Sequence, residues 1–346
     1  MTLTQRIQAF AALGTKLQEL LTQPTNEFLQ ILQKAESQNP WFTQENSLKM
    51  LANIAQMLNK ADLEQWLTNY DLPEKPQKTI AVIMAGNIPM VGFHDALCVL
   101  VSGNALVAKL SSKDAVLLPF VFELLVEIEP GFADCIHIEQ ALLKNFDAII
   151  ATGSNNSARY FDYYFGKYPH IIRKNRNSVA VLNGNETVEQ LQALGNDIFD
   201  YFGLGCRSVA KLYVPHNYDF TKLFDTWDRF WNLTQHNKYM NNYEYNKSIL
   251  LVSGTPHFDT GYALFTENSG YNSAIAVNHF EYYETIEQLA QTLQRDSELL
   301  QCVVSECDIN GVPTIRFGNA QKNKLSDYAD GVDVVRFLLA MWTNTF

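Results

Sequence analysis

Three short segments of the sequence carry side chains that could do chemistry. AGNIPM (85–90) and ATGSNNS (151–157) combine small residues with amide and hydroxyl groups, and YFGLGCRSVAKLYV (201–214) contains Cys206. The glycines that precede Cys206 allow a tight loop, in which a backbone N–H beside the sulfur can point at the oxygen of a carbonyl that the sulfur attacks. Cys206 is therefore a candidate covalent nucleophile. The alternative is a small buried residue, the usual fate of a free cysteine.

Alternating elements are predicted to position these segments. Helical patterns near 90–102, through 118–128 and at 187–202 alternate with short apolar runs typical of strands. The runs lie at 81–86, 105–111, 135–139, 148–153, 179–184, 211–215, 248–253, 273–280, 302–307 and 314–318. Such alternation predicts a largely parallel sheet, and its restart at 179 predicts a second α/β domain. Ligands bind beyond the carboxyl ends of strands in these folds.

The sequence suggests four divisions of the chain. Residues 1–75 have apolar positions at helical spacing and end in the breaker LPEKPQK, so a helical N-terminal segment is expected. A nucleotide-binding domain over 76–175, a catalytic cysteine domain over 176–335 and a C-terminal tail over 336–346 follow. The polar stretch 235–247 is expected to be a surface excursion. The apolar stretch GVDVVRFLLAMWTNTF at the C-terminus is either an interface or a core helix.

Composition excludes several classes of function. The formal net charge is −11 and only 18% of residues are charged, which gives no general attraction to nucleic acid or anionic lipid. The chain shows neither a signal peptide nor an apolar stretch of membrane length, so we expect no membrane span and a cytoplasmic location. The five cysteines and the histidines have no metal-ligand spacing, so no metal is expected.

In this order the motifs resemble the aldehyde dehydrogenase superfamily, and most closely its acyl-CoA reductase branch, which includes the fatty-acid reductase component of bacterial luminescence systems. The likeness spans roughly residues 78–340 and implies two Rossmann-like parallel-sheet domains. It implies that Asn87 is the oxyanion-hole asparagine and Lys109 the cofactor-ribose lysine. Gly153 and Ser154 match the TGS turn that approaches the cofactor, and Cys206 matches the nucleophile.

The resemblance has informative departures. Leu204 replaces the usual Gln before the cysteine, and Lys211 replaces an Arg after it. TENSGYNSAIAV (266–277) is similar to the EIFGP segment, although its aromatic residue and proline are missing. Glu267 would then be the carboxylate that holds the nicotinamide ribose.

The most informative departure lies at Arg173. In RKNRNSVAVLNG, Arg173 stands where hydrolytic relatives have the glutamate that activates water. A protein without that general base is poorly equipped to release a free acid, but it can still exchange an acyl group with a thiol and reduce it. The resemblance therefore implies reduction of an acyl thioester, foremost a fatty acyl-CoA, to an aldehyde through an acyl-cysteine.

The cofactor and partners follow from the same resemblance. The position where an acid often selects NAD is Ser112, and Lys113 follows it, so charge complementarity favours NADPH, with NADH as the alternative. Lys113 could also be only a solvated residue. The acyl carrier would be coenzyme A or an acyl carrier protein. A homodimer is also implied, and an acyl-donating partner protein is a further hypothesis.

Other functions remain open at this point. γ-Glutamyl phosphate reductase also lacks the catalytic glutamate, so the substrate could be an acyl phosphate. A cysteine acyltransferase or thioesterase would need a general base, for which His94, His170 and His236 are available without a triad context. A non-catalytic binding protein that keeps the fold is the remaining alternative.

Overall fold

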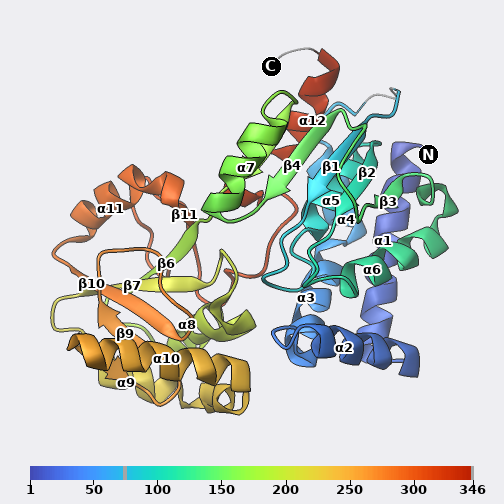
Figure 1. Cartoon of the computed structure of the whole chain (residues 1–346). Helices are drawn as coiled ribbons and strands as arrows, with labels where there is room; N and C mark the ends of the chain where they lie inside the picture. Colours follow the sequence, from blue (N-terminus) through green and yellow to red (C-terminus); the bar gives the residue numbers. More distant parts are fainter. Residues whose placement is uncertain (73–75, 344–346) are drawn as a thin grey trace. The chain divides into compact units, whose positions relative to one another are not determined.

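The computed structural model describes residues 1–72 and 76–343, which fall into two compact units (Figure 1). Unit 1 comprises residues 1–175 and 323–346, and unit 2 comprises residues 176–322. The predicted domain boundary at residue 75 and the last three residues of the predicted tail lie outside the described residues. No helix in the described residues is long and apolar enough to cross a membrane.

Unit 1 contains a five-stranded sheet whose described neighbours all pair in parallel. The strands are β1 (Thr79–Ile83), β2 (Ala105–Lys109), β3 (Ile136–Ile138), β4 (Ala148–Thr152) and β5 (His170–Arg173), in the spatial order β3-β2-β1-β4-β5. The chain therefore builds outward from β1 in one direction and then crosses to β4 on the other side. Such a reversal of strand order is the topological switch point of a doubly wound sheet.

The two faces of this sheet bury different side chains. Ile80 and Val82 of β1 join the large core, whereas Ala81 and Ile83 face a smaller cluster with Phe161. The large core packs against α5 (Phe93–Val101), α6 (Leu117–Ile128) and the short 3₁₀ helix η1 (Pro130–Phe132). The smaller cluster is covered by α7 (Asn155–Phe165). Alternation of side chains along each strand produces both layers.

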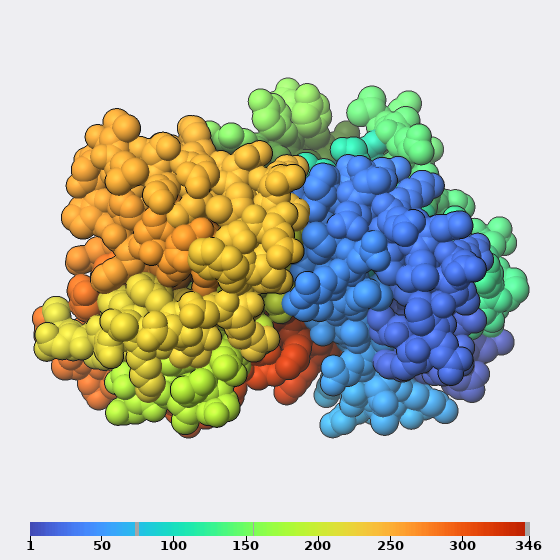
Figure 2. All heavy atoms as spheres, turned by 90° about the horizontal axis from the view of Figure 1, so that it is seen from below, coloured from blue at the N-terminus to red at the C-terminus, as the bar shows by residue number. Residues whose placement is uncertain are grey.

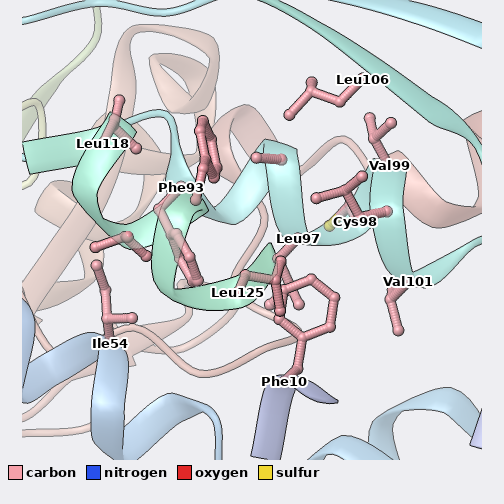
Figure 3. Packing of buried hydrophobic residues seen from close by; sticks show 14 of the residues in the cluster. Phe10, Ile54, Phe93, Leu97, Cys98, Val99, Val101, Leu106, Leu118 and Leu125 are labelled. Carbon is pink, nitrogen blue, oxygen red and sulfur yellow. The ribbon is translucent and has the colours of Figure 1, made fainter. Parts of the chain in front are cut away.

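The predicted N-terminal helical segment is confirmed. Its helices are α1 (Leu3–Thr22), α2 (Asn26–Gln38), α3 (Gln44–Met57) and α4 (Lys60–Leu67). Thr2 and Gln5 form a capping box that starts α1, and Thr25 and Thr43 cap the next two helices. Figure 2 shows the N-terminal residues, in blue, gathered over one face of unit 1. Figure 3 shows Phe10 and Ile54 packing toward Leu97 and Leu125, so these helices complete the core of unit 1.

The C-terminal segment also belongs to unit 1, which differs from the predicted division at residue 335. The indole of Trp66 donates a hydrogen bond to the Tyr328 hydroxyl (2.9 Å), and Tyr70 donates to Asp333 (2.9 Å). The short helix η5 (Ala329–Gly331) leads into α12 (Val334–Thr343), where Val334, Val335, Leu338 and Met341 are buried in the core. This apolar face is therefore a core helix of unit 1.

Unit 2 contains a seven-stranded sheet in the order β12-β11-β6-β7-β10-β9-β8. Its strands are β6 (Asn177–Val181), β7 (Val209–Pro215), β8 (His257–Asp259), β9 (Leu264–Glu267), β10 (Val277–Tyr283), β11 (Leu300–Ser305) and β12 (Thr314–Ile315). The described neighbours pair in parallel except β8 with β9. The fold predicted from the sequence, two α/β domains with parallel sheets, is confirmed.

The helices of unit 2 correct one sequence prediction. They are α8 (Val188–Phe199), η2 (Asp200–Gly203), α9 (Phe220–Thr226), η3 (Asp228–Gln235), α10 (Asn237–Ser253), α11 (Ile286–Arg295) and η4 (Ser297–Leu299). The stretch 235–247 is mostly helix and is exposed apart from a few residues, whereas 248–253 continues that helix and is not the predicted strand. No glycine or proline interrupts α10 until Gly254, whose φ of 65° ends it.

Candidate functional site

Four predicted site residues of unit 1 gather at the carboxyl edge of its sheet. Asn87 follows β1, Lys109 is the last residue of β2, and Gly153 and Ser154 directly follow β4. Because β1 and β4 are neighbours at the switch point, the loops that follow them leave the sheet side by side. The structure thus brings these residues to the edge where such folds bind ligands.

The turn after β4 is built for close approach. Ser154 caps α7, and its Oγ accepts a hydrogen bond from the Ser157 N–H (3.2 Å). A Cβ on Gly153 would lie 2.8 Å from Ser157 Cβ and 2.9 Å from a ring atom of Phe161, so only glycine fits there. The first-turn N–H groups of the eleven-residue α7 lie at this edge and favour an anionic group such as phosphate.

Lys109 is held at the same edge by backbone carbonyls. Its ammonium donates to the carbonyl of Ala141 (2.8 Å) and to that of Gln140. Ser112 and Lys113 lie beyond it in an exposed turn before α6, so neither is at the start of the helix itself. The ammonium of Lys109 and the exposed Lys113 make this turn cationic.

Cys206 lies in unit 2, exposed, just before β7. Tyr201, Phe202 and Gly203 precede it with φ angles of 54°, 58° and 71°, so three consecutive residues adopt the left-handed conformation. A residue with a Cβ pays about 1 kcal/mol or more in that region. Strained backbone of this kind is concentrated at functional sites, because only specific surroundings can hold it.

Packing and hydrogen bonds hold this turn. The Phe202 ring lies 4.2 Å from the His236 ring, centroid to centroid, and packs near Tyr239 as well. Beyond the turn, the Gly205 N–H donates to Ser208 Oγ (3.2 Å), and the Ser208 N–H donates to the Gly205 carbonyl (3.0 Å). The Cys206 segment is therefore fixed on both sides.

Ser178 and Cys302 lie beside the Cys206 segment, which sequence reasoning missed. Ser178 Oγ donates to the Cys206 carbonyl (2.9 Å) and lies 3.0 Å from Cys302 Sγ. Cys302 sits where the pairing of β11 with β6 shifts register, a β-bulge that turns its side chain toward Ser178. Burial raises the pKa of the Cys302 thiol to about 11, so it stays protonated beside Cys206. The residues are distant in sequence, and no local pattern signals their contact.

Glu267, proposed from the resemblance to hold the nicotinamide ribose, lies in unit 2. This residue is exposed at the carboxyl end of β9 and lies level with Leu212 in the sheet register. Cys206 precedes the opposite, amino end of β7. The segment that returns from β9 to β10, residues 268–276, contains no carboxylate. The role of Glu267 at the nicotinamide ribose stays a prediction from the resemblance.

Lys211 is completely buried on β7. Its ammonium donates to the Ser269 carbonyl (2.7 Å) and pairs with the Glu281 carboxylate (2.5 Å). Burial lowers the pKa of Lys211, and the bond to Glu281 partly offsets this. The lysine that replaces the expected arginine therefore anchors the start of the 268–276 loop.

Arg173, at the expected position of the water-activating glutamate, is buried in unit 1. Its guanidinium donates two hydrogen bonds to the Asp95 carboxylate of α5, at 2.5 and 2.9 Å. Burial disfavours the charge, but Asp95 outweighs burial and raises the pKa of Arg173. A permanently charged guanidinium in an ion pair cannot act as a general base.

The three histidines named as alternative bases have separate settings. His94 lies in the core of unit 1, where its Nε2 contacts the Leu325 carbonyl (2.9 Å). His170 is exposed on β5 and bonds the Tyr168 carbonyl. His236 shares unit 2 with Cys206, and its Nδ1 accepts the Tyr239 N–H (3.1 Å), which places the proton of the neutral ring on Nε2.

Solved structures with the same fold are aldehyde dehydrogenases. Aldehyde dehydrogenase 21 from Physcomitrella patens, in complex with the reaction product succinate, matches with a TM-score of 0.72 and 11% identity over 99% of this chain and 84% of that one. Indole-3-acetaldehyde dehydrogenase from P. syringae, in complex with NAD+, gives 0.66 and 13% over 88% and 72%. The NAD+ complex of the Bacillus cereus aldehyde dehydrogenase gives 0.61 and 12% over 88% and 72%. The predicted aldehyde-dehydrogenase-like fold is confirmed.

Sequence comparison matches a smaller part of the chain than the structural comparison does. No curated protein matches the chain. The profile of the family described as acyl-CoA reductase (LuxC) matches residues 16–222, more than half of the sequence. This range includes Asn87, Lys109, Ser154 and Cys206 but ends before Glu267. The chain therefore belongs to the acyl-CoA reductase (LuxC) family.

Proposed function

We propose that this chain reduces an acyl thioester, foremost a fatty acyl-CoA, to an aldehyde, with Cys206 as the covalent nucleophile and NADPH as the reductant. One observation carries the proposal: Cys206 is exposed at the end of a strained left-handed turn, in a chain whose family performs acyl reduction. A buried structural cysteine would not need such a turn.

The steps follow from the chemistry of the residues. The Cys206 thiolate attacks the acyl carbonyl, and the Cys206 N–H donates to the oxyanion. Asn87 is proposed to stabilise the oxyanion because the family resemblance implies that role. The carrier thiolate leaves, and the acyl group stays on Cys206 as a thioester. A bound nicotinamide cofactor would supply the hydride that reduces this thioester. The thiohemiacetal formed on Cys206 then collapses, releasing the aldehyde and restoring the thiolate.

The Arg173–Asp95 pair supports reduction over hydrolysis. Hydrolysis of acyl-Cys206 needs a base to deprotonate water, and the guanidinium at this position offers none. The acyl-enzyme would then persist until it is reduced or returned to a thiol.

The carboxyl edge of unit 1 fits a dinucleotide. Gly153 lets the turn after β4 pack closely against α7, the first turn of α7 would face a pyrophosphate, and Lys109 would offer its ammonium to a ribose hydroxyl. The exposed Ser112 and Lys113 favour the 2′-phosphate of NADPH. Lys113→Glu should shift the ratio of kcat/KM for NADPH over NADH toward NADH by about tenfold or more. Lys34→Glu, an exposed lysine of α2, is the control that should not.

The first experiment measures NADPH oxidation with acyl-CoAs from acetyl to palmitoyl. Cys206→Ala should lose on the order of 10³-fold in kcat or more, whereas Cys302→Ala should keep most of the activity. Wild-type turnover by Cys206→Ala would reject the covalent mechanism. Activity with acyl phosphates alone would favour the alternative substrate class.

The remaining expectations stay predictions. They are the choice between coenzyme A and an acyl carrier protein, the homodimer, the acyl-donating partner and the cytoplasmic location.

A further inference from the structure

The loop that carries Asn87 is tied at both ends to one neighbouring segment. At its start, the Met84 N–H donates to the Lys109 carbonyl (3.0 Å). At its other end, the Met90 N–H donates to Asp114 Oδ2 (2.6 Å). Both acceptors belong to residues 109–114, the segment that also contains Lys109, Ser112 and Lys113.

The anchor at Met90 holds an unfavourable backbone conformation. Met90 has a φ of 51°, which residues with a Cβ rarely adopt. The loop is also tightly packed at two glycines. A Cβ on Gly86 would lie 2.5 Å from Ser111 Oγ, and a Cβ on Gly92 would lie 2.5 Å from Met84 Cγ. The N–H of Met90 can point at Asp114 only while this conformation is kept.

Asp114 is an unusual residue to use as an anchor. It is 1% exposed, and its Oδ1 has no hydrogen-bond partner within the described residues. Burial raises the pKa of its carboxyl to about 7, while the backbone N–H groups of Met90 and Leu118 lower it. A buried carboxyl with an unsatisfied oxygen is costly, so its place requires an explanation beyond packing.

We propose that Asp114 is a positioning residue for Asn87. By fixing the Met90 N–H, it holds the 85–90 loop in the conformation that presents the Asn87 amide, and it joins that loop to the segment proposed to bind the cofactor. This inference rests on the proposed oxyanion role of Asn87. No sequence motif points to Asp114, because its partner lies 24 residues away.

Two substitutions separate hydrogen bonding from charge. Asp114→Ala removes the acceptor, whereas Asp114→Asn keeps an amide oxygen that can accept from Met90. We expect Asp114→Ala to lower kcat by about 10- to 100-fold, with the KM values for acyl-CoA and NADPH changed less than about threefold. Asp114→Asn should restore most of the rate. If Asp114→Ala does not fold, Asp114→Leu fills the space without accepting a hydrogen bond.

Two readouts need no cofactor. Release of coenzyme A on formation of acyl-Cys206, measured without nucleotide, should slow by the same factor as kcat. Amide hydrogen exchange of the peptide over residues 84–93 should accelerate in Asp114→Ala and not in Asp114→Asn. Asp147→Ala is the matched control, because Asp147 accepts the Thr79 N–H (2.8 Å) at the other end of β1. It should leave this peptide and the acylation rate unchanged.

A double-mutant cycle with Asn87→Ala decides the route of action. In the Asn87→Ala background, adding Asp114→Ala should lower the acylation rate by less than about threefold. A full additional loss would show that Asp114 acts elsewhere and would overturn the proposal, as would unchanged exchange and acylation in Asp114→Ala. Wild-type acylation by Asn87→Ala alone would instead reject the oxyanion role of Asn87, and the exchange result would still decide whether Asp114 anchors the loop.

Discussion

Arg173 and Asp95 form a buried, two-hydrogen-bond ion pair inside unit 1, at 2.5 and 2.9 Å. Both side chains are less than a tenth exposed. The residue that the resemblance places at the position of the water-activating glutamate is thus part of the core of this unit. Its side chain holds α5 against the end of β5.

Arg173→Glu should therefore not create a hydrolytic enzyme. The new carboxylate would face Asp95 in a buried site, and loss of one partner of a buried ion pair costs about 3–5 kcal/mol of unfolding free energy. We expect a lower denaturation midpoint and no release of free acid from acyl-CoA. The double variant Arg173→Met with Asp95→Leu should recover most of the stability, because it removes both charges. Acid release by Arg173→Glu at a rate comparable to reduction would contradict this reading.

The buried Asp197 should make unit 2 less stable at neutral than at acidic pH. Its carboxyl accepts the N–H groups of Gly318 (2.6 Å) and Ala320 (3.0 Å), and burial raises its pKa from 3.8 to about 7. Between these two values the folded protein keeps a proton that the unfolded chain releases, so stability falls as pH rises through this window.

Asp197→Asn removes that loss. The difference in unfolding free energy between Asp197→Asn and the wild type should shift in favour of the variant by about 2–3 kcal/mol from pH 5 to pH 8. Urea denaturation at each pH measures this difference. Asp134→Asn, at an exposed position, serves as the control and should not change how the unfolding free energy depends on pH. If the unfolding free energies of wild type and Asp197→Asn changed in parallel with pH, the pKa of Asp197 would not be raised in the folded protein.

The left-handed turn before Cys206 predicts that glycine at position 202 gives a more stable protein than alanine, the reverse of the usual order. Both Phe202→Ala and Phe202→Gly lose the ring contact with His236, but only glycine tolerates a φ of 58° without strain. Phe202→Gly should therefore be more stable than Phe202→Ala by about 1 kcal/mol, whereas glycine is usually the worse residue. Thermal unfolding of both variants measures the difference. A more stable Phe202→Ala would mean that residue 202 does not keep its positive φ.

Lys211 and Glu281 should respond unequally to substitution. Lys211→Met removes a completely buried cation and leaves Glu281, which is 39% exposed, to be solvated. Glu281→Gln instead leaves the ammonium buried without its counter-ion, which should cost about 3 kcal/mol or more. Because burial already lowers the pKa of Lys211, the instability of Glu281→Gln should lessen as pH rises. Denaturation at neutral and alkaline pH tests this; equal losses in both variants would show that the charge is not buried.

Several features of the fold could be predicted because they are local. The buried strand of β1, the helix starts at Thr2 and Thr187, and the glycines before Cys206 follow from periodicity, capping and turn chemistry. Even the gathering of Asn87, Lys109 and Ser154 at one edge was foreseeable, because parallel strands place their carboxyl ends together. Prediction failed at α10, where the run ILLV favours a strand but the helix continues to Gly254.

The sequence alone determined the nucleophile candidate and the alternating α/β pattern, since each depends on residue type and short spacing, and the resemblance added the prediction that Arg173 replaces the general base. Only the tertiary structure decided that Ser178 and Cys302 lie beside Cys206 and that Asp114 accepts a hydrogen bond from the loop that carries Asn87. These contacts join residues far apart in the chain. They depend on strand register, bulges and burial, which form only when the sheets are assembled.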